Sequence, residues 1–263
     1  MVDASKYGPW AVIAGGSEGV GAEFARQLAA EGINLVLIAR KPGPLEVTAR
    51  ECREIGAEVR AVALDLVEPE STSRIIAATA GLQVGLLVYN AGANTCSAPF
   101  LDADLEEFHR VIDLNVMRML DLVHHFAKPM KSRRRGGILL VGSVAGTHGS
   151  VCQSVYTGVK AFGRLFAESL WIELRDYGVD VLELVLGVTR TPAMERVGLN
   201  FDVPGLVISE PADVAREGLT NLASGPVFIA GGNAEAMHQG SGPDRAAIVL
   251  GAHQFIQELI GRR

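Results

Sequence analysis

Ala14-Gly15-Gly16-Ser17-Glu18-Gly19-Val20-Gly21 is the most informative stretch of this sequence, because it joins a strand pattern to a helix pattern. The apolar run at 10–14 before it predicts a buried strand. After it, Val20, Phe24 and Leu28 are spaced as one face of a helix. Glycines at such a turn let backbone N–H groups and the helix N-terminus approach a phosphate closely. The stretch therefore predicts a nucleotide-binding unit, although a glycine-rich loop by itself can be an ordinary turn.

The rest of the chain repeats the same alternation of strand and helix. Repeated βαβ units predict a parallel sheet with helices on both faces. We therefore expect an α/β fold, a single doubly wound Rossmann domain over residues 1–263 with a seven-stranded parallel sheet. No linker, internal repeat or low-complexity tract interrupts this pattern. The predicted strands lie near 10–14, 33–39, 59–64, 85–89, 137–142, 179–186 and 226–230.

A second signal is Tyr156-Thr157-Gly158-Val159-Lys160, with Ser143 thirteen residues upstream of the tyrosine. Positions i and i+4 share a helix face, so the Lys160 ammonium can lie beside the Tyr156 phenol and favour its ionised form. A free phenol titrates near about pH 10, so this neighbour would make Tyr156 a usable general acid or base at neutral pH. Alone, the spacing also fits an amphipathic helix with a snorkelling lysine.

Together these two motifs resemble the short-chain dehydrogenase/reductase family, whose glycine motif is written TGxxxGxG. Gly15, Gly19 and Gly21 match that motif, with Ala14 in place of the usual threonine. The family's Asn-Asn-Ala-Gly after the fourth strand appears here as Tyr89-Asn90-Ala91-Gly92. The resemblance implies a Rossmann-fold oxidoreductase that binds a nicotinamide cofactor.

Four positions match the family's catalytic residues, and the resemblance runs from about Trp10 to Phe228. It implies reversible hydride transfer at a carbonyl carbon. Ser143 would hydrogen-bond the carbonyl oxygen while Tyr156 donates the proton that the developing alkoxide needs. Lys160 would also bind the nicotinamide ribose, and Asn115 would connect Lys160 to solvent through water. Each of these residues also has a structural alternative, such as a small residue at a strand end or an ordinary buried polar group.

The end of the second predicted strand indicates NADP(H) as the cofactor. An acidic residue about 20 positions beyond the glycine motif would bind the adenosine ribose of NAD, whereas an arginine can hold the 2′-phosphate of NADP. The strand ends in Ala39-Arg40-Lys41, without an acid. A guanidinium matches phosphate geometry, and Lys41 adds a second charge. Arg40 could instead be a solvated residue that opens the turn at 42–44.

The remaining cofactor contacts are predicted at the carboxyl ends of the strands, where ligands bind on such sheets. By resemblance, Asp65 and Leu66 contact the adenine, residues 90–92 line the ribose, and Thr191 holds the carboxamide or a phosphate. Leu186 stands where the family usually has a proline, which makes this turn less rigid. The predicted cofactor set is Gly15, Ser17, Glu18, Gly19, Val20, Gly21, Arg40, Asp65, Leu66, Asn90, Ala91, Gly92, Tyr156, Lys160, Val188 and Thr191.

Two segments bear on the substrate, a lid at about 192–209 and a C-terminal extension at about 231–263. The resemblance implies that the lid folds over the substrate, and an apolar lid favours a lipophilic ketone or secondary alcohol, although its residues could only cover the cofactor. The stretch from Gly15 through Arg40 most resembles family branches that act on steroid or long-chain acyl ketones, so the resemblance implies a steroid, aryl or long-chain acyl ketone. The lid's apolar residues are Met194, Val197, Leu199, Phe201, Val203, Leu206, Val207 and Ile208. In the extension we expect a polar stretch and then a helix over 246–260. A buried face, more often core than interface, is predicted for that helix from Ile248, Phe255, Ile256, Leu259 and Ile260. Whether the helix closes the substrate site or packs between subunits stays open.

Composition and charge exclude several classes of binding partner. A net charge of −6 argues against a nucleic-acid surface. No apolar stretch approaches the roughly 18 residues of a membrane helix, and the first residues lack the apolar core of a signal peptide, so we expect no membrane insertion and a cytoplasmic location. Three widely spaced cysteines, without CxxC or HExxH, predict no disulfide framework and no metal site. We also expect a homo-oligomer, either a dimer or a tetramer, that acts on a small molecule.

Two other functions stay open at this point. One is a catalytically silent regulator that senses the NADPH/NADP ratio, although such relatives commonly lose the tyrosine or the lysine that this chain keeps. The other is a partner-binding protein that uses the C-terminal extension. A dehydratase or epimerase is a third possibility within the enzyme class, although those relatives are generally longer.

Overall fold

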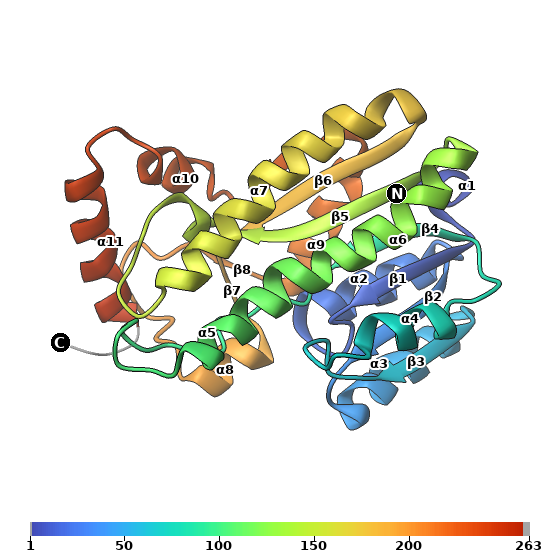
Figure 1. The fold of residues 1–263 in the computed structure, drawn as a ribbon, viewed down its shortest axis with the longest axis horizontal. Helices are drawn as coiled ribbons and strands as arrows, with labels where there is room; N and C mark the ends of the chain where they lie inside the picture. The colour runs from blue at the N-terminus through green and yellow to red at the C-terminus, as the bar shows by residue number, and fades with distance from the viewer. Residues whose placement is uncertain (1, 260–263) are drawn as a thin grey trace.

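Seven parallel strands form one sheet in the order β3-β2-β1-β4-β5-β6-β9 (Figure 1). The computed structural model describes residues 2–259. The chain builds outward from β1 first in one direction and then, from β4, in the other, so a ligand-binding crevice is expected between β1 and β4. The strands are β1 (Trp10–Ala14), β2 (Asn34–Ala39), β3 (Val59–Ala63), β4 (Val84–Tyr89), β5 (Gly136–Ser143), β6 (Val179–Leu186) and β9 (Val227–Ile229).

Helices cover both faces of this sheet, which confirms the predicted doubly wound fold (Figure 1). One face packs on α2 (Gly19–Ala30), α3 (Pro42–Ile55) and α9 (Pro211–Asn221). The other face is covered by α4 (Ser71–Ala78), α5 (Leu105–Ile112), α6 (Arg118–Arg133) and α7 (Ser154–Leu174). A short π-helical segment, η1 (Asp113–Met117), joins α5 to α6.

Strand β1 shows why the sequences of the central strands are continuous apolar runs. All of its residues are buried. Ala11 and Ile13 pack into the core on the α2 side, while Val12 and Ala14 pack into the core on the α6 side. A strand with helices on both faces needs apolar side chains at every position, because successive side chains point to opposite faces.

Further elements lie beyond the carboxyl ends of the strands, at the left of Figure 1. A small parallel sheet there was not predicted from the sequence, and neither was a helix inside the polar stretch. Short elements also occur at α1 (Ala4–Tyr7) and at the 3₁₀ turns Val144–Thr147, Arg175–Tyr177 and Leu222–Ser224. The elements at the carboxyl ends are β7 (Val188–Thr189), α8 (Pro192–Val197), β8 (Ile208–Ser209), α10 (Ala234–Gly240) and α11 (Arg245–Leu259).

The C-terminal helix corrects one prediction. It begins near the expected residue, but of its predicted buried face only Leu259 is buried, and Phe255 is 38% exposed. Ile260 lies outside the described residues. The prediction was wrong because the apolar face of α11 borders a cleft rather than a packed core. Across residues 2–259, none of the helices combines the length and the hydropathy that a bilayer crossing requires.

Candidate active site

The glycine turn ties the ends of the central strands together. The backbone N–H groups of Gly15 and Gly16 donate to the Ile38 carbonyl at the end of β2. The Asn90 side-chain amide, just after β4, donates to the Gly15 carbonyl at 2.9 Å. A Cβ at Gly21 would clash with that same carbonyl, so glycine is required for α2 to lie this close to the end of β1.

A cleft of about 980 Å³ lies at the carboxyl ends of the strands. It is bounded on its far side by α10 and α11. Every residue of the predicted cofactor set lines it except Gly21, which is buried under the turn. Glycine at the turn and a cleft of this size at the point of strand reversal fit a dinucleotide.

Three of the four predicted catalytic residues face this cleft. They are Ser143 at the end of β5, and Tyr156 and Lys160 in the first turns of α7. The Lys160 Nζ lies 5.7 Å from the centroid of the Tyr156 ring and donates to the Val141 carbonyl at 3.1 Å. The ammonium therefore lies beside the phenol ring, as expected from the i, i+4 spacing, and keeps donors for a ligand.

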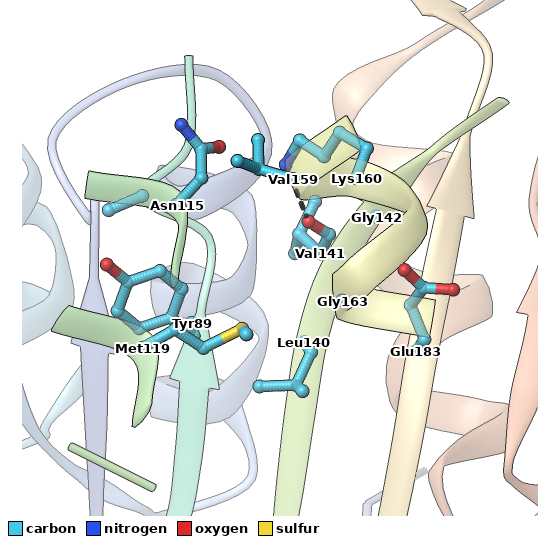
Figure 2. Close-up of a pocket in the computed structure, with 11 residues that line it drawn as sticks. Tyr89, Asn115, Met119, Leu140, Val141, Gly142, Val159, Lys160, Gly163 and Glu183 are labelled. Carbon is cyan, nitrogen blue, oxygen red and sulfur yellow. Dashed lines mark hydrogen bonds between the residues drawn. The ribbon is translucent and has the colours of Figure 1, made fainter. Parts of the chain in front are cut away.

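The fourth predicted residue, Asn115, lies behind Lys160 rather than in the cleft (Figure 2). It is carried by the π-helical segment η1, a rare geometry that is frequent at functional sites. Its Nδ2 donates to the carbonyls of Val111 at 2.9 Å and Ala93 at 3.1 Å, whereas its Oδ1 is buried and accepts no hydrogen bond from the described residues. A Cβ at Gly92 would lie 2.8 Å from both this Oδ1 and the Lys160 Nζ, so both atoms face Gly92.

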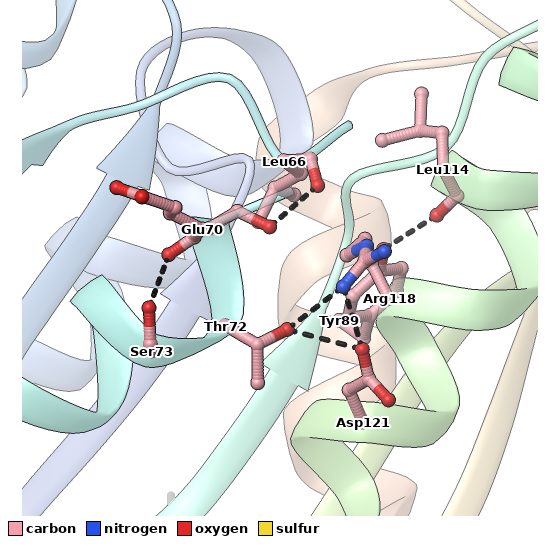
Figure 3. Close-up of polar contacts among 9 residues, drawn as sticks. Leu66, Glu70, Thr72, Ser73, Tyr89, Leu114, Arg118 and Asp121 are labelled. Carbon is pink, nitrogen blue, oxygen red and sulfur yellow. Dashed lines mark hydrogen bonds and ion pairs between the residues drawn. The ribbon is translucent and has the colours of Figure 1, made fainter. Parts of the chain in front are cut away.

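Partly buried polar contacts hold the π-helical segment in place (Figure 3). The Tyr89 hydroxyl donates to the Leu114 carbonyl at 2.5 Å, and burial raises the pKa of this phenol. Just after the segment, the Arg118 guanidinium donates to Asp121 at 2.7 Å and to Thr72 of α4 at 3.1 Å. Tyr89 replaces an asparagine of the family motif, and its hydroxyl fixes the residue next to Asn115.

At the other end of the cleft, Arg40 and Lys41 are exposed and lie at its rim. Neither forms an ion pair with any residue between 2 and 259, so both charges are available to a phosphate. Glu18 instead pairs with Arg196 of α8 through two contacts, one of 2.9 Å. The Arg196 guanidinium, and more weakly Lys41 and Arg40, lower the pKa of Glu18.

The segment after β6, residues 188–209, packs over the glycine turn. Thr191 lines the cleft, and its hydroxyl caps α8 by accepting from the Met194 N–H at 3.3 Å. A Cβ at Gly19 would lie 3.0 Å from the Thr191 side chain, so this segment and the glycine turn are in close contact. Of the predicted lid residues, Val197 points to solvent and Val203 is buried, whereas those lining the cleft are Met194, Leu199, Leu206 and Val207.

Sequence reasoning missed several residues of the site. Gln239 of α10 and His148 bring polar groups to the otherwise apolar end of the cleft. Arg196 reaches Glu18 across 178 residues of sequence. No local pattern could have identified these residues, because each enters the site through packing between distant elements.

Glu183 is a further residue that the sequence did not indicate. It lies inside β6, is only 2% exposed, and its Oε2 has no protein hydrogen-bond partner. Burial raises the pKa of this carboxyl to about 7, against the opposing effect of Lys160 and Arg164. A strand residue that is acidic within an apolar run is the only signal that could have identified it.

Stability should depend on pH through Glu183. Its folded-state pKa lies above its value of 4.5 in the absence of burial, so the free energy of unfolding falls as pH rises from about 4.5 to about 7. Glu183→Gln removes this dependence. The variant should gain about 3 kcal/mol over wild type as pH rises from about 4 to about 8, as measured by urea denaturation. Glu173→Gln, at an exposed position of α7, is the control and should show a constant difference. A constant difference for Glu183→Gln would contradict the prediction.

Comparison with known proteins agrees with this geometry. The family model for short chain dehydrogenases matches residues 9–200. A very-long-chain 3-oxoacyl-CoA reductase of Neurospora crassa is 35% identical over 219 residues, which make up 81% of this chain and 64% of the fungal protein. A 7beta-hydroxysteroid dehydrogenase of Collinsella aerofaciens is 34% identical over 190 residues, 72% of each chain. The match thus leaves about a third of the fungal relative uncovered.

Solved structures match over nearly the whole chain. One, from work on 7beta-hydroxysteroid dehydrogenase stereoselectivity, has a TM-score of 0.86 and 29% identity, covering 95% of this chain and 98% of its own. A short-chain dehydrogenase from Sphingobium yanoikuyae in complex with NADPH has a TM-score of 0.78 and 28% identity, covering 95% of each chain. The motifs, the fold and these matches agree, and the chain belongs to the short-chain dehydrogenase family.

Proposed function

We propose that this oxidoreductase interconverts a lipophilic ketone and a secondary alcohol with NADP(H). The observation that carries the proposal is that Ser143, Tyr156 and Lys160 face one cleft, which the glycine turn also lines. A hydroxyl, a phenol and an ammonium at one surface can hold a carbonyl oxygen and exchange a proton with it.

The cleft has the groups that a nicotinamide dinucleotide needs. The turn at 15–21 would hold the pyrophosphate, Asp65 and Leu66 the adenine, and residues 90–92 the ribose. Arg40 and Lys41 would hold a 2′-phosphate. When bound, the nicotinamide supplies or accepts the hydride, and the protein contributes positioning and electrostatics.

The protein's own residues would bind the carbonyl oxygen and transfer the proton to it. In the reduction direction, the Ser143 hydroxyl donates to the carbonyl oxygen and holds it next to Tyr156. The phenol of Tyr156 gives its proton to the oxygen as negative charge develops there. The nearby ammonium of Lys160 stabilises the phenolate that remains. Asn115, behind Lys160, would link the ammonium to water through its free Oδ1.

The proposed substrate class rests on the far wall of the cleft. That wall combines the apolar lid residues with Ile248, Phe255 and Ile256 of α11, and its few polar groups include His148 and Gln239. An apolar wall with few polar groups favours a large lipophilic molecule that carries one or two oxygens. The names of the matched relatives, a 3-oxoacyl-CoA reductase and a hydroxysteroid dehydrogenase, support the same class.

Tyr156→Phe tests the chemistry. Without the phenol hydroxyl no proton can be donated, so kcat on a panel of steroid, aryl and long-chain ketones should fall by about 10²–10⁴-fold. NADPH affinity should stay nearly unchanged, as measured by fluorescence titration. Tyr177→Phe, in the 3₁₀ turn that follows α7, is the matched control and should keep full activity. Persistent turnover in Tyr156→Phe would refute the role, and tight NADPH binding by a wild type that reduces no ketone would favour a silent regulator.

Arg40→Ala tests the cofactor preference. Loss of a charge-assisted contact to phosphate costs about 1.5–3 kcal/mol, so the Kd for NADPH should rise by about 10–100-fold. The Kd for NADH should change little, because NADH has no 2′-phosphate. Arg50→Ala, on the exposed side of α3, should change neither constant. A wild-type protein that binds NADH more tightly than NADPH would contradict the proposal.

We also propose that the chain forms a homo-oligomer through the outer face of α7. Phe162, Leu165 and Ile172 recur on one helix face and are 39%, 60% and 65% exposed. Apolar residues gathered on one exposed face are typical of protein–protein contacts. Helix α5 packs beside α7 and adds Leu105, which is 55% exposed.

Leu165→Glu tests this interface. A charge in the centre of an apolar contact is costly to bury, so light scattering should show wild-type oligomers and a smaller species for the variant. Val47→Glu, at a position of α3 that is 44% exposed, is the control and should leave the molar mass unchanged. A wild type with the molar mass of one chain would contradict the proposal.

A further inference from the structure

The carboxyl group of Glu183 lies directly under the helix that carries Lys160. Glu183 pairs in register with Leu140 of β5 and points to the sheet face that α7 covers, as do Val179 and Val181. Its Oε1 would be 3.5 Å from a Cβ at Gly163, and a Cβ at Gly142 would clash with it. Gly163 is three residues after Lys160, so the carboxyl lies one helical turn from the lysine on the same side of α7.

Glu183 and Lys160 also share a small cavity with Asn115 (Figure 2). Its volume is about 10 Å³, close to what a single water requires. Two acceptors there, Asn115 Oδ1 and Glu183 Oε2, lack protein partners. Among the described residues that line the cavity, Lys160 carries the only positive charge. In Figure 2, Asn115 lies on one side, Glu183 on the other, and the Lys160 side chain between them.

A carboxyl at this position has an energetic cost. Burying an ionised carboxylate without a bonded partner costs several kcal/mol, and an apolar side chain of similar size avoids that cost. The neighbouring positions of β6 are Leu182 and Leu184, both fully buried. Buried ionisable groups with perturbed pKa values are concentrated at functional sites. Because Glu183 lies beneath Lys160, its carboxyl can act on the charge of that lysine.

We propose that Glu183 is a positioning residue that acts through Lys160: its carboxyl attracts the ammonium and sets how much positive charge Tyr156 experiences. The inference rests on the proposed roles of Tyr156 and Lys160. Ionised Glu183 partly cancels the field of the ammonium at the phenol. Neutral Glu183 leaves that field complete and favours the phenolate.

The charge state of Glu183 changes near neutral pH, which makes this control pH-dependent. The other charged groups that act on Glu183 are Arg164 and Glu168, both on α7. Besides Glu183 and Lys160, Tyr89 is the titratable side chain among the described residues that line the cavity. Its hydroxyl donates to the Leu114 carbonyl. The adjacent strands β5 and β9 have no titratable residue within their bounds.

The first test measures the coupling without cofactor or turnover. Infrared titration of the cofactor-free protein should show a protonated carboxyl band that Glu183→Gln removes and that titrates near pH 7. Lys160→Met removes the charge that favours ionisation, so the midpoint should rise by on the order of one pH unit. Lys128→Met, at an exposed position of α6, should leave the midpoint unchanged. An unchanged midpoint in Lys160→Met would overturn the inference.

The second test follows alcohol oxidation against pH at saturating NADP. Glu183→Gln leaves the ammonium field uncancelled, so its rate should reach half of its plateau at a pH lower by on the order of one unit than wild type. Glu173→Gln should coincide with wild type. A Glu183→Gln profile that also coincides with wild type would overturn the inference. If Tyr156→Phe retains turnover, the proposed function fails instead, and the infrared titration still reports the coupling of Glu183 to Lys160.

Discussion

The backbone turn at Gly15 joins the three central strands, and the cleft is arranged around it. Its N–H bonds the end of β2, its carbonyl accepts from Asn90 after β4, and α2 starts against that same carbonyl. Only a glycine at position 21 allows that contact, since any Cβ would clash with the carbonyl oxygen. The turn therefore fixes where α2 begins relative to β4, at the point where strand order reverses.

The proton-handling end of the cleft depends on a different set of contacts. The Val141 carbonyl of β5 anchors the Lys160 ammonium, and the π-helical segment brings Asn115 behind it. Tyr89 holds that segment from β4, so the lysine and the asparagine are both positioned by the sheet. The small cavity between them is closed on its other side by Glu183. A polar site enclosed in this way has a low effective dielectric, in which each charge acts strongly on its neighbours.

The segments beyond the carboxyl ends of the strands give the cleft its apolar side. Here the sequence predicted the helix at 246–260 and favoured a core for its apolar face, but left open whether the helix closes the substrate site. The pattern of α11 is the same in either case, because an apolar helix face can cover a core or a ligand cleft. The helix α10 was missed because its polar residues lack the apolar periodicity that predicts a helix. The β7–β8 pair was missed because each strand has only two residues.

The sequence alone determined the seven strands, the glycine turn and the shared helix face of Tyr156 and Lys160. These features arise between neighbours in the chain, through the period of apolar residues and the absence of a Cβ. Packing between distant elements settled the rest: the pairing of Glu18 with Arg196, the side of α11 that borders the cleft, and the burial of Glu183 beneath Lys160. No local pattern encodes those contacts, because each depends on how elements far apart in sequence are brought together by the sheet.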